Sequence, residues 1–307
     1  MADPALLRLL ALLKAAGYRF SAPAPATHRR VLLRRGRSAA RDLADVLGWN
    51  MRFDDGLLDT EILAALHAAK ALVRHGRQWR SRYRVASIGD RLFLHSAFPT
   101  DKDAVFFGPD SHRFAAWIEH AVPRVKAGAR ILDIGAGSGV GGVVAASRAR
   151  APRLTLTDVN AKALALAAVN VESAGLTADL AFCDGLPPGK GRFDLIVANP
   201  PYIGAAPKKT YADGGGALGL DLSIAWTKAA LPRLAARGRF VLYSGAAIGR
   251  GGDPLRAALA PLAQAADCDL VYEEIDPDVF PSTLLNRAYW RSERIAAIGA
   301  VLSRRAP

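Results

Sequence analysis

Four residues at positions 199–202 have the types and the order that nitrogen chemistry requires. They read Asn199-Pro200-Pro201-Tyr202 and follow the apolar run FDLIVA. The Asn199 side-chain oxygen and the Pro200 carbonyl can each accept one N–H of a substrate NH₂ group, and the prolines hold this backbone rigid. Two fixed acceptors orient the nitrogen and favour the positive charge that develops on it, while Tyr202 offers a flat ring to a flat acceptor. We therefore predict Asn199, Pro200 and Tyr202 as catalytic residues.

A glycine-rich turn earlier in the chain predicts where a cofactor binds. LDIGAGSGVGG, residues 132–142, reads as a strand that runs into this turn and then into a helix. Glycines such as Gly135 and Gly137 let the backbone approach a ligand closely. Asp133 precedes the turn, where it suits a cationic amino-acid group and would repel a pyrophosphate. The turn therefore favours S-adenosylmethionine over a dinucleotide.

Two further carboxylates follow the next two predicted strands. Asp158 lies 23 positions after Gly135, a spacing at which a carboxylate can accept hydrogen bonds from both ribose hydroxyls. Asp184 can accept a hydrogen bond from an adenine amino group. One such Asp is often only a helix N-cap, but three acids at successive strand ends beside a glycine turn indicate a binding site. The predicted cofactor-binding residues are Asp133, Gly135, Gly137, Asp158 and Asp184.

The elements that must position these residues follow from the hydrophobic pattern. From residue 129 onward, short β-type runs alternate with apolar-periodic helical segments, which is typical of parallel βαβ units. We predict an α/β fold with a doubly wound, mostly parallel seven-stranded sheet, the last two runs pairing at its far edge. The expected strands are 129–134, 153–158, 178–184, 193–199, 239–245, 269–275 and 294–304.

The pattern before residue 105 differs and predicts a smaller domain. Segments 4–17, 43–49 and 60–74 read as helices, and segments 83–88 and 92–95 read as a hairpin. Helices followed by a hairpin are the element order of a winged-helix module. We predict a basic substrate-recognition domain over residues 1–104 and a cofactor-binding catalytic domain over residues 105–307.

Charge and composition bear on partners and location. The chain of 307 residues carries a net charge of +13, and residues 28–91 hold fourteen Lys or Arg against seven Asp or Glu. Such a surface attracts RNA, DNA or acidic proteins, although an Arg-rich composition can also reflect the base content of a genome. No apolar run approaches the roughly 20 residues of a membrane span. Cys183 and Cys268 make neither a disulfide framework nor a metal cluster. We expect no metal, no membrane and a cytoplasmic location, and leave the oligomeric state open.

Several blocks of the chain resemble a known family. LDIGAGSG, TDVNAKALALAAVN, FDLIVANPPYIG and YADGGGALGLDL are similar to successive blocks of the release-factor glutamine methyltransferases, class I enzymes that use S-adenosylmethionine and carry N/D-P-P-Y/F. The resemblance covers about residues 129–245. It implies a class I methyltransferase fold, S-adenosylmethionine as cofactor, and a glutamine-containing protein loop as acceptor. It also implies that Asn199 and Tyr202 bind the glutamine amide. The family has a proline-arginine segment where this chain has VFFGPDSHRF, residues 105–114.

Other acceptors and functions stay open. The basic N-terminal region favours an amino group of adenine or guanine in RNA or DNA. A metabolite as methyl acceptor is a further alternative. A regulatory protein that only senses the cofactor would not need residues 199–202, so the intact tetrad argues against that function.

Two long segments suggest further contacts with the substrate. The glycine-rich loop 203–222, with Lys208 and Lys209, suits a lid over the acceptor. The insertion 276–294 contains Phe280, Tyr289 and Trp290, which could stack on a base or cover the sheet edge.

Overall fold

The fold is described from a computed structural model of the chain. It covers residues 2–36, 38–97, 103–122, 124–204, 214–216 and 218–306. Of the predicted lid at 203–222, residues 205–213 and 217 lie outside these ranges. Among the described helices, none is both long and apolar enough to cross a membrane.

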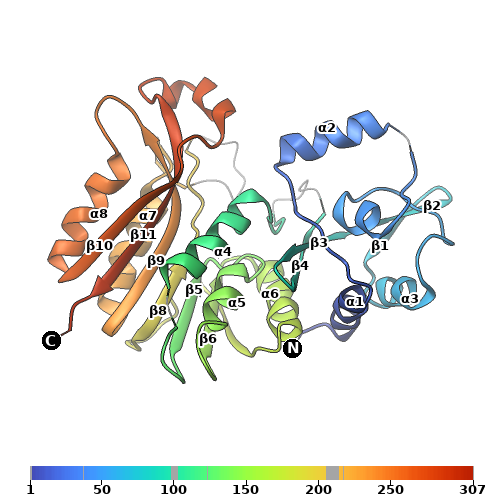
Figure 1. The fold of residues 1–307 in the computed structure, drawn as a ribbon, viewed down its shortest axis with the longest axis horizontal. Coiled ribbons are helices and arrows are strands. Elements are labelled where there is room, and N and C mark those ends of the chain that lie inside the picture. Colours follow the sequence, from blue (N-terminus) through green and yellow to red (C-terminus); the bar gives the residue numbers. More distant parts are fainter. Residues whose placement is uncertain are drawn as a thin grey trace.

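One large sheet dominates the C-terminal part of the chain (Figure 1). Its order is β10-β11-β9-β8-β5-β6-β7, with β5 to β9 mutually parallel and β11 antiparallel to both of its neighbours. This confirms the predicted mostly parallel seven-stranded sheet, including the pairing of the last two strands at its edge. The strands are β5 (Arg130–Ile134), β6 (Arg153–Asp158), β7 (Ala178–Phe182), β8 (Phe193–Ala198), β9 (Leu234–Ile248), β10 (Cys268–Asp276) and β11 (Arg294–Arg304).

Alternating side chains of the sheet build two separate cores. In β8, Leu195 and Val197 belong to one buried cluster, while Ile196 and Ala198 belong to the other. Successive residues of a strand point to opposite faces, so a strand buried on both faces reads as a continuous apolar run. This is why FDLIVA carries no polar alternation.

Helices cover both faces of the sheet (Figure 1). Helices α4, α5 and α6 pack on one face, and α7 and α8 pack on the other. The carboxyl ends of the parallel strands thus open between two helical layers, which is where ligands bind in such sheets. The bounds are α4 (Pro109–Ala121), α5 (Val140–Ala146), α6 (Ala161–Ser173), α7 (Asp221–Ala230) and α8 (Pro254–Ala265).

The N-terminal part combines short helices with two hairpins. The expected hairpin is present as β3 and β4, but the predicted helix over 60–74 is wrong in its second half. Helix α3 ends at Ala68, and Leu72 begins a strand because the Val73 to Trp79 segment turns at Gly76 and pairs with itself. The elements are α1 (Pro4–Ala15), α2 (Pro25–Arg35), the π-helical turn η1 (Ala44–Gly48), α3 (Thr60–Ala68), β1 (Leu72–His75), β2 (Gln78–Ser81), β3 (Tyr83–Ile88) and β4 (Arg91–Ser96).

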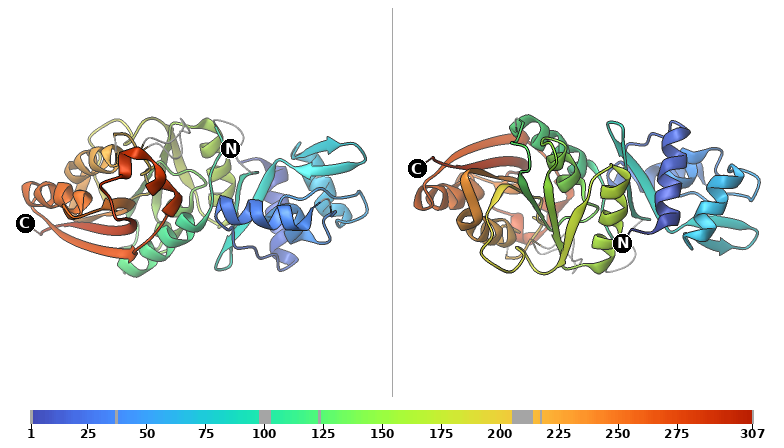
Figure 2. Two further views of the ribbon diagram at one scale, coloured as in Figure 1. Left: turned by 90° about the horizontal axis from the view of Figure 1, so that it is seen from above. Right: turned by 90° about the horizontal axis from the view of Figure 1, so that it is seen from below.

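The N-terminal part packs against helix α6, which covers one face of the large sheet. The N-terminal part and the part that contains the large sheet lie end to end (Figure 2). Asn170 of α6 is fully buried, and its amide bonds the Leu94 N–H at 2.8 Å, the Leu94 carbonyl at 2.9 Å and the Ser138 carbonyl at 2.8 Å. One side chain therefore joins the hairpin to the glycine turn. Val105 packs in the core of the N-terminal part, so the division at 104/105 stays a prediction.

Candidate functional site

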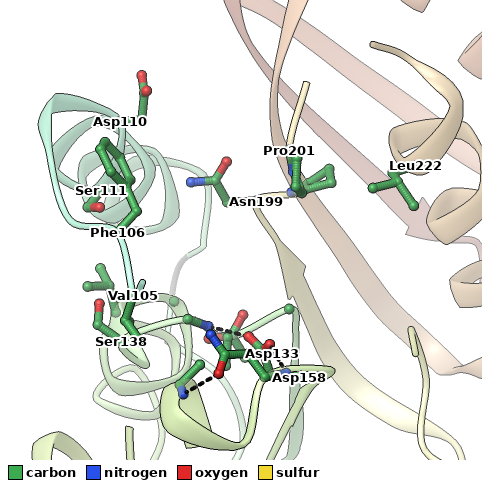
Figure 3. Close-up of a pocket in the computed structure, with 18 of the residues that line it drawn as sticks. Val105, Phe106, Asp110, Ser111, Asp133, Ser138, Asp158, Asn199, Pro201 and Leu222 are labelled. Carbon is green, nitrogen blue, oxygen red and sulfur yellow. Dashed lines mark hydrogen bonds between the residues drawn. The ribbon is translucent and has the colours of Figure 1, made fainter. Parts of the chain in front are cut away.

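A cavity of about 530 Å³ opens at the carboxyl ends of β5, β6 and β8 (Figure 3). Its volume is in the range that holds a cofactor-sized ligand. The structure brings together here all eight residues that the sequence analysis selected. They are Asp133, Gly135, Gly137, Asp158, Asp184, Asn199, Pro200 and Tyr202.

The turn after β5 leaves room for a ligand against its backbone. Gly137 has φ +55°, and a Cβ added there would meet no atom within 4 Å. Gly135 has φ +65°, and its Cβ would lie 2.5 Å from the Trp226 ring. Both positions require the left-handed backbone that glycine tolerates. The open space at Gly137 is therefore available to a bound group, while Gly135 packs against Trp226, which also lines the cavity.

Asp158, at the end of β6, is held in place by the backbone. Its Oδ2 accepts the Gly137 N–H and its Oδ1 accepts the Asn160 N–H, each at 2.8 Å (Figure 3). A carboxylate has about four acceptor positions, so one on each oxygen remains. Burial raises the pKa of Asp158. The oriented carboxylate retains the two acceptors that a vicinal diol requires.

Asp133 lies beside Asp158 beneath the glycine turn and is fully buried (Figure 3). Its Oδ2 accepts the N–H of Gly142, in the first turn of α5, at 2.7 Å. Burial raises the pKa of Asp133 to about 8, and the neighbouring Asp158 carboxyl acts in the same direction. A cation entering the cavity would meet two carboxyls that lack a cationic partner among the described side chains.

Asp133 makes the stability of the protein depend on pH in a defined direction. Because the pKa is raised in the folded state, the contribution of the Asp133 proton to stability is fully present below about pH 4, where the unfolded state is also protonated, and is lost as pH rises to about 8. Asp133→Asn keeps the acceptor for Gly142 and cannot ionise. Relative to this variant, we expect wild type to lose on the order of 3 kcal/mol of unfolding free energy between pH 5 and pH 8. Urea unfolding of both proteins at the two pH values measures this, and parallel curves would contradict it.

Asn199 follows the last residue of β8, and its amide projects into the cavity. Figure 3 shows the side chain directed toward Phe106, which precedes α4, and Ser111, in the first turn of α4, both across the cavity. Within the described part of the chain, no group bonds to the Asn199 amide or to the Pro200 carbonyl. Both acceptors are therefore available to an external NH₂ group.

Tyr202 is more enclosed than the sequence suggested. Its ring lies against Gly245, where a Cβ would approach to 2.3 Å, and contacts Tyr243 and Phe280 edge to face at centroid distances of 6.2 and 5.9 Å. Burial, followed by the neighbouring Asp110 carboxyl, raises the pKa of Tyr202 well above its usual value. Tyr202 is thus a fixed neutral ring in the cavity wall.

Other cavity residues lie outside the eight that the sequence analysis selected. Asp110 and Ser111 reach it from the start of α4, and the Tyr243 hydroxyl donates to Asp110 Oδ1 at 2.9 Å. Phe280 lines it with φ +56°, an uncommon angle for a residue with a side chain. The aromatic residues in VFFGPDSHRF and in the insertion 276–294 were the sequence features that could have placed both segments at the cavity.

In the insertion 276–294, Val279 and Tyr289 pack in the core on the α4 face of the sheet, and both expectations for this segment stay predictions. The Tyr289 hydroxyl is buried; it accepts the Gly204 N–H at 2.7 Å and donates to the Gly204 carbonyl at 3.5 Å. Trp290 is 71% exposed and lies outside the cavity. Residues 205–213, with Lys208 and Lys209, lie outside the described residues, so the predicted lid stays a prediction.

The cavity fits S-adenosylmethionine. The buried Asp133 carboxyl suits its cationic methionine group, Asp158 suits a ribose diol, and the exposed Asp184, which also lines the cavity, suits the amino group of an adenine. Among the described residues, no group of three His, Cys, Asp or Glu side chains could hold a metal ion.

Comparison with known proteins extends these observations. The model of the Methyltransferase small domain family matches residues 116–212. A release factor glutamine methyltransferase of Cereibacter sphaeroides is 30% identical over 250 residues, covering 74% of this chain and 84% of that protein. A Chlorobaculum tepidum protein of the same description is 32% identical over 155 residues, covering 46% and 51%. A ribosomal RNA small subunit methyltransferase C of Erwinia tasmaniensis is 40% identical over 73 residues, covering 24% and 21%.

Solved structures that align with the chain are more distant in sequence. A Thermus thermophilus 16S rRNA N2 G1207 methyltransferase, in complex with S-adenosylmethionine and guanosine, aligns with a TM-score of 0.48 at 17% identity and covers 83% of this chain and 64% of its own. The match to the Cereibacter protein is long enough to assign this chain to a family. The chain belongs to the release factor glutamine methyltransferase family and is a class I S-adenosylmethionine-dependent methyltransferase.

Proposed function

We propose that this enzyme methylates the side-chain amide of a glutamine in a protein. The observation that carries the proposal is the pair of unbonded acceptors, Asn199 Oδ1 and the Pro200 carbonyl, at the cavity wall opposite α4. The relatives described as release factor glutamine methyltransferases support an amide as the acceptor.

The chain's residues bind and orient the reactants in this proposal. Asp158 holds the ribose of the cofactor, Asp133 its amino group and Asp184 its base, while Gly135 and Gly137 allow close contact with the turn. When bound, S-adenosylmethionine supplies an electrophilic methyl group.

The acceptor amide is a poor nucleophile because its nitrogen lone pair is delocalised. Asn199 and Pro200 accept its two N–H groups and thereby fix the direction of the nitrogen. Their oxygens also stabilise the positive charge that develops there. The Tyr202 ring, held by Tyr243 and Phe280, bounds the flat acceptor on one side.

A base amino group in nucleic acid is the second candidate. It has the same planar NH₂ geometry, and the match to a ribosomal RNA methyltransferase over 73 residues together with the net charge of +13 favours it. Residues 199–202 would act on either acceptor in the same way.

Transfer of a labelled methyl group separates the two candidates. The purified enzyme is incubated with cell extract and methyl-tritiated S-adenosylmethionine, and parallel samples are treated with protease, RNase or DNase. We expect the label to be lost after protease treatment and to survive treatment with RNase or DNase. Acid hydrolysis should release the label as methylamine. Label removed by a nuclease would contradict the protein acceptor.

A further inference from the structure

Helix α2, which the sequence analysis did not anticipate, carries a cationic face at the mouth of the cavity. Pro25, the first residue of α2, is exposed and also lines the cavity. From there the helix runs away from the large sheet across the N-terminal part (Figures 1 and 2). The helix contains no acidic residue and includes Arg29, Arg30, Arg34 and Arg35.

Contacts on the inner side of α2 fix the orientation of the helix, so a defined set of side chains faces outward. His28 is buried and its ring lies 5.4 Å from that of Trp49. Arg35 pairs with Asp45 and lies over the Trp49 ring at 5.4 Å. With the inner side held in this way, Arg29, Arg30, Leu33 and Arg34 remain exposed, Leu33 by 72%.

The outer arginines of α2 differ from three other arginines of the N-terminal part, which pair with carboxylates. Arg8 pairs with Glu61, Arg41 with Asp45 and Arg74 with Asp55. In the described residues, no carboxylate pairs with Arg29, Arg30 or Arg34. Arg52, Arg77 and Arg82 are also exposed without a carboxylate partner among these residues, but on α2 the unneutralised charge lies on one short helix face that includes an exposed leucine.

We propose that this face of α2 binds an acidic segment of the acceptor polypeptide next to the methylated glutamine. A short patch with an apolar centre fits a few carboxylates and an apolar side chain better than a nucleic-acid backbone, which presents an uninterrupted row of phosphates. The proposal rests on the proposed protein acceptor and specifies its class.

The length of α2 sets where the acidic residues lie. Arg30 and Arg34 are five and nine residues beyond Pro25, or about 8 and 14 Å along the helix at about 1.5 Å per residue. An extended polypeptide spans at most about 3.3–3.6 Å per residue. Pro25 lines the cavity that would hold the glutamine, so the acidic side chains should lie at least about two to four residues from the glutamine on one side, which positions two to six include.

Binding of fluorescent peptides tests this inference independently of methyl transfer. One peptide has a central glutamine with Asp and Glu at positions two to six on either side, one has Ser and Asn there, and a third acidic peptide has Leu in place of glutamine. Arg30→Ala/Arg34→Ala removes two charges without weakening the helix, since Ala is the best helix former. Arg150→Ala/Arg153→Ala, at the opposite edge of the sheet, removes the same charge.

We expect both acidic peptides to bind wild type at least about fivefold more tightly than the neutral peptide, an effect of about 1 kcal/mol. The α2 variant should lose this preference and the Arg150/Arg153 variant should keep it. Equal binding of acidic and neutral peptides, or a preference that survives in the α2 variant, would overturn the inference. So would an RNA oligonucleotide that binds α2 more tightly than an acidic peptide of equal charge. Acidic peptides that bind through α2 but are never methylated would support the surface and count against the proposed glutamine acceptor.

Discussion

Asn199→Ala is expected to lower kcat by on the order of a hundredfold or more, the size seen when one positioned polar group is removed from a transition state. The variant loses one of two acceptors that orient the substrate nitrogen. The affinity for S-adenosylmethionine should change little, because the proposed cofactor contacts lie at Asp133 and Asp158. Steady-state kinetics and calorimetry with the cofactor measure the two effects.

The same substitution has a clear control. The Asn199 amide has no partner among the described residues, so its removal should leave the urea unfolding midpoint near that of wild type. Asn199→Asp keeps an acceptor oxygen and should retain more activity than Asn199→Ala. Wild-type kcat in the alanine variant would refute the role of residues 199–202.

Asp158→Ala should mainly weaken cofactor binding, whereas Asn199→Ala mainly lowers kcat. We expect it to raise the dissociation constant for S-adenosylmethionine by on the order of a hundredfold. Hydrogen bonds to a charged acceptor contribute about 1.5–3 kcal/mol each, and a ribose diol would form two. The substitution also frees the N–H groups of Gly137 and Asn160, which loosens the turn. Calorimetric titration of the variant measures the affinity.

Asp179→Ala is the matched control, since Asp179 is an exposed carboxylate on the adjacent strand β7. It should bind the cofactor as wild type does. An unchanged affinity in Asp158→Ala, or an equal loss in both variants, would show that Asp158 does not hold the ribose.

The sheet could be predicted because each of its strands carries a local signal. Strands buried on both faces appear as continuous apolar runs, and in a parallel sheet their carboxyl ends lie on one edge. This is sufficient to bring Asp133, Asp158, Asp184 and Asn199 into one cavity, as the structure shows. The positions of these polar residues after successive strands were thus sufficient to predict the candidate site.

The N-terminal part could not be predicted to the same extent because its elements are short and depend on tertiary contacts. The segment after Ala68 has the composition of a helix, yet Leu72 to His75 pairs with β2, and Phe53 bridges to Trp79. Helix α2 has few apolar residues and is held by His28 and Arg35, which no periodicity reveals. Phe280 likewise reaches the cavity through an irregular insertion.

A crystal structure with S-adenosylhomocysteine and a glutamine peptide tests the central claim most directly. We predict that the acceptor amide donates one N–H to Asn199 Oδ1 and the other to the Pro200 carbonyl, with the nucleoside at Asp158. An acceptor nitrogen bound elsewhere in the cavity, or a nucleoside away from Asp158, would contradict the account.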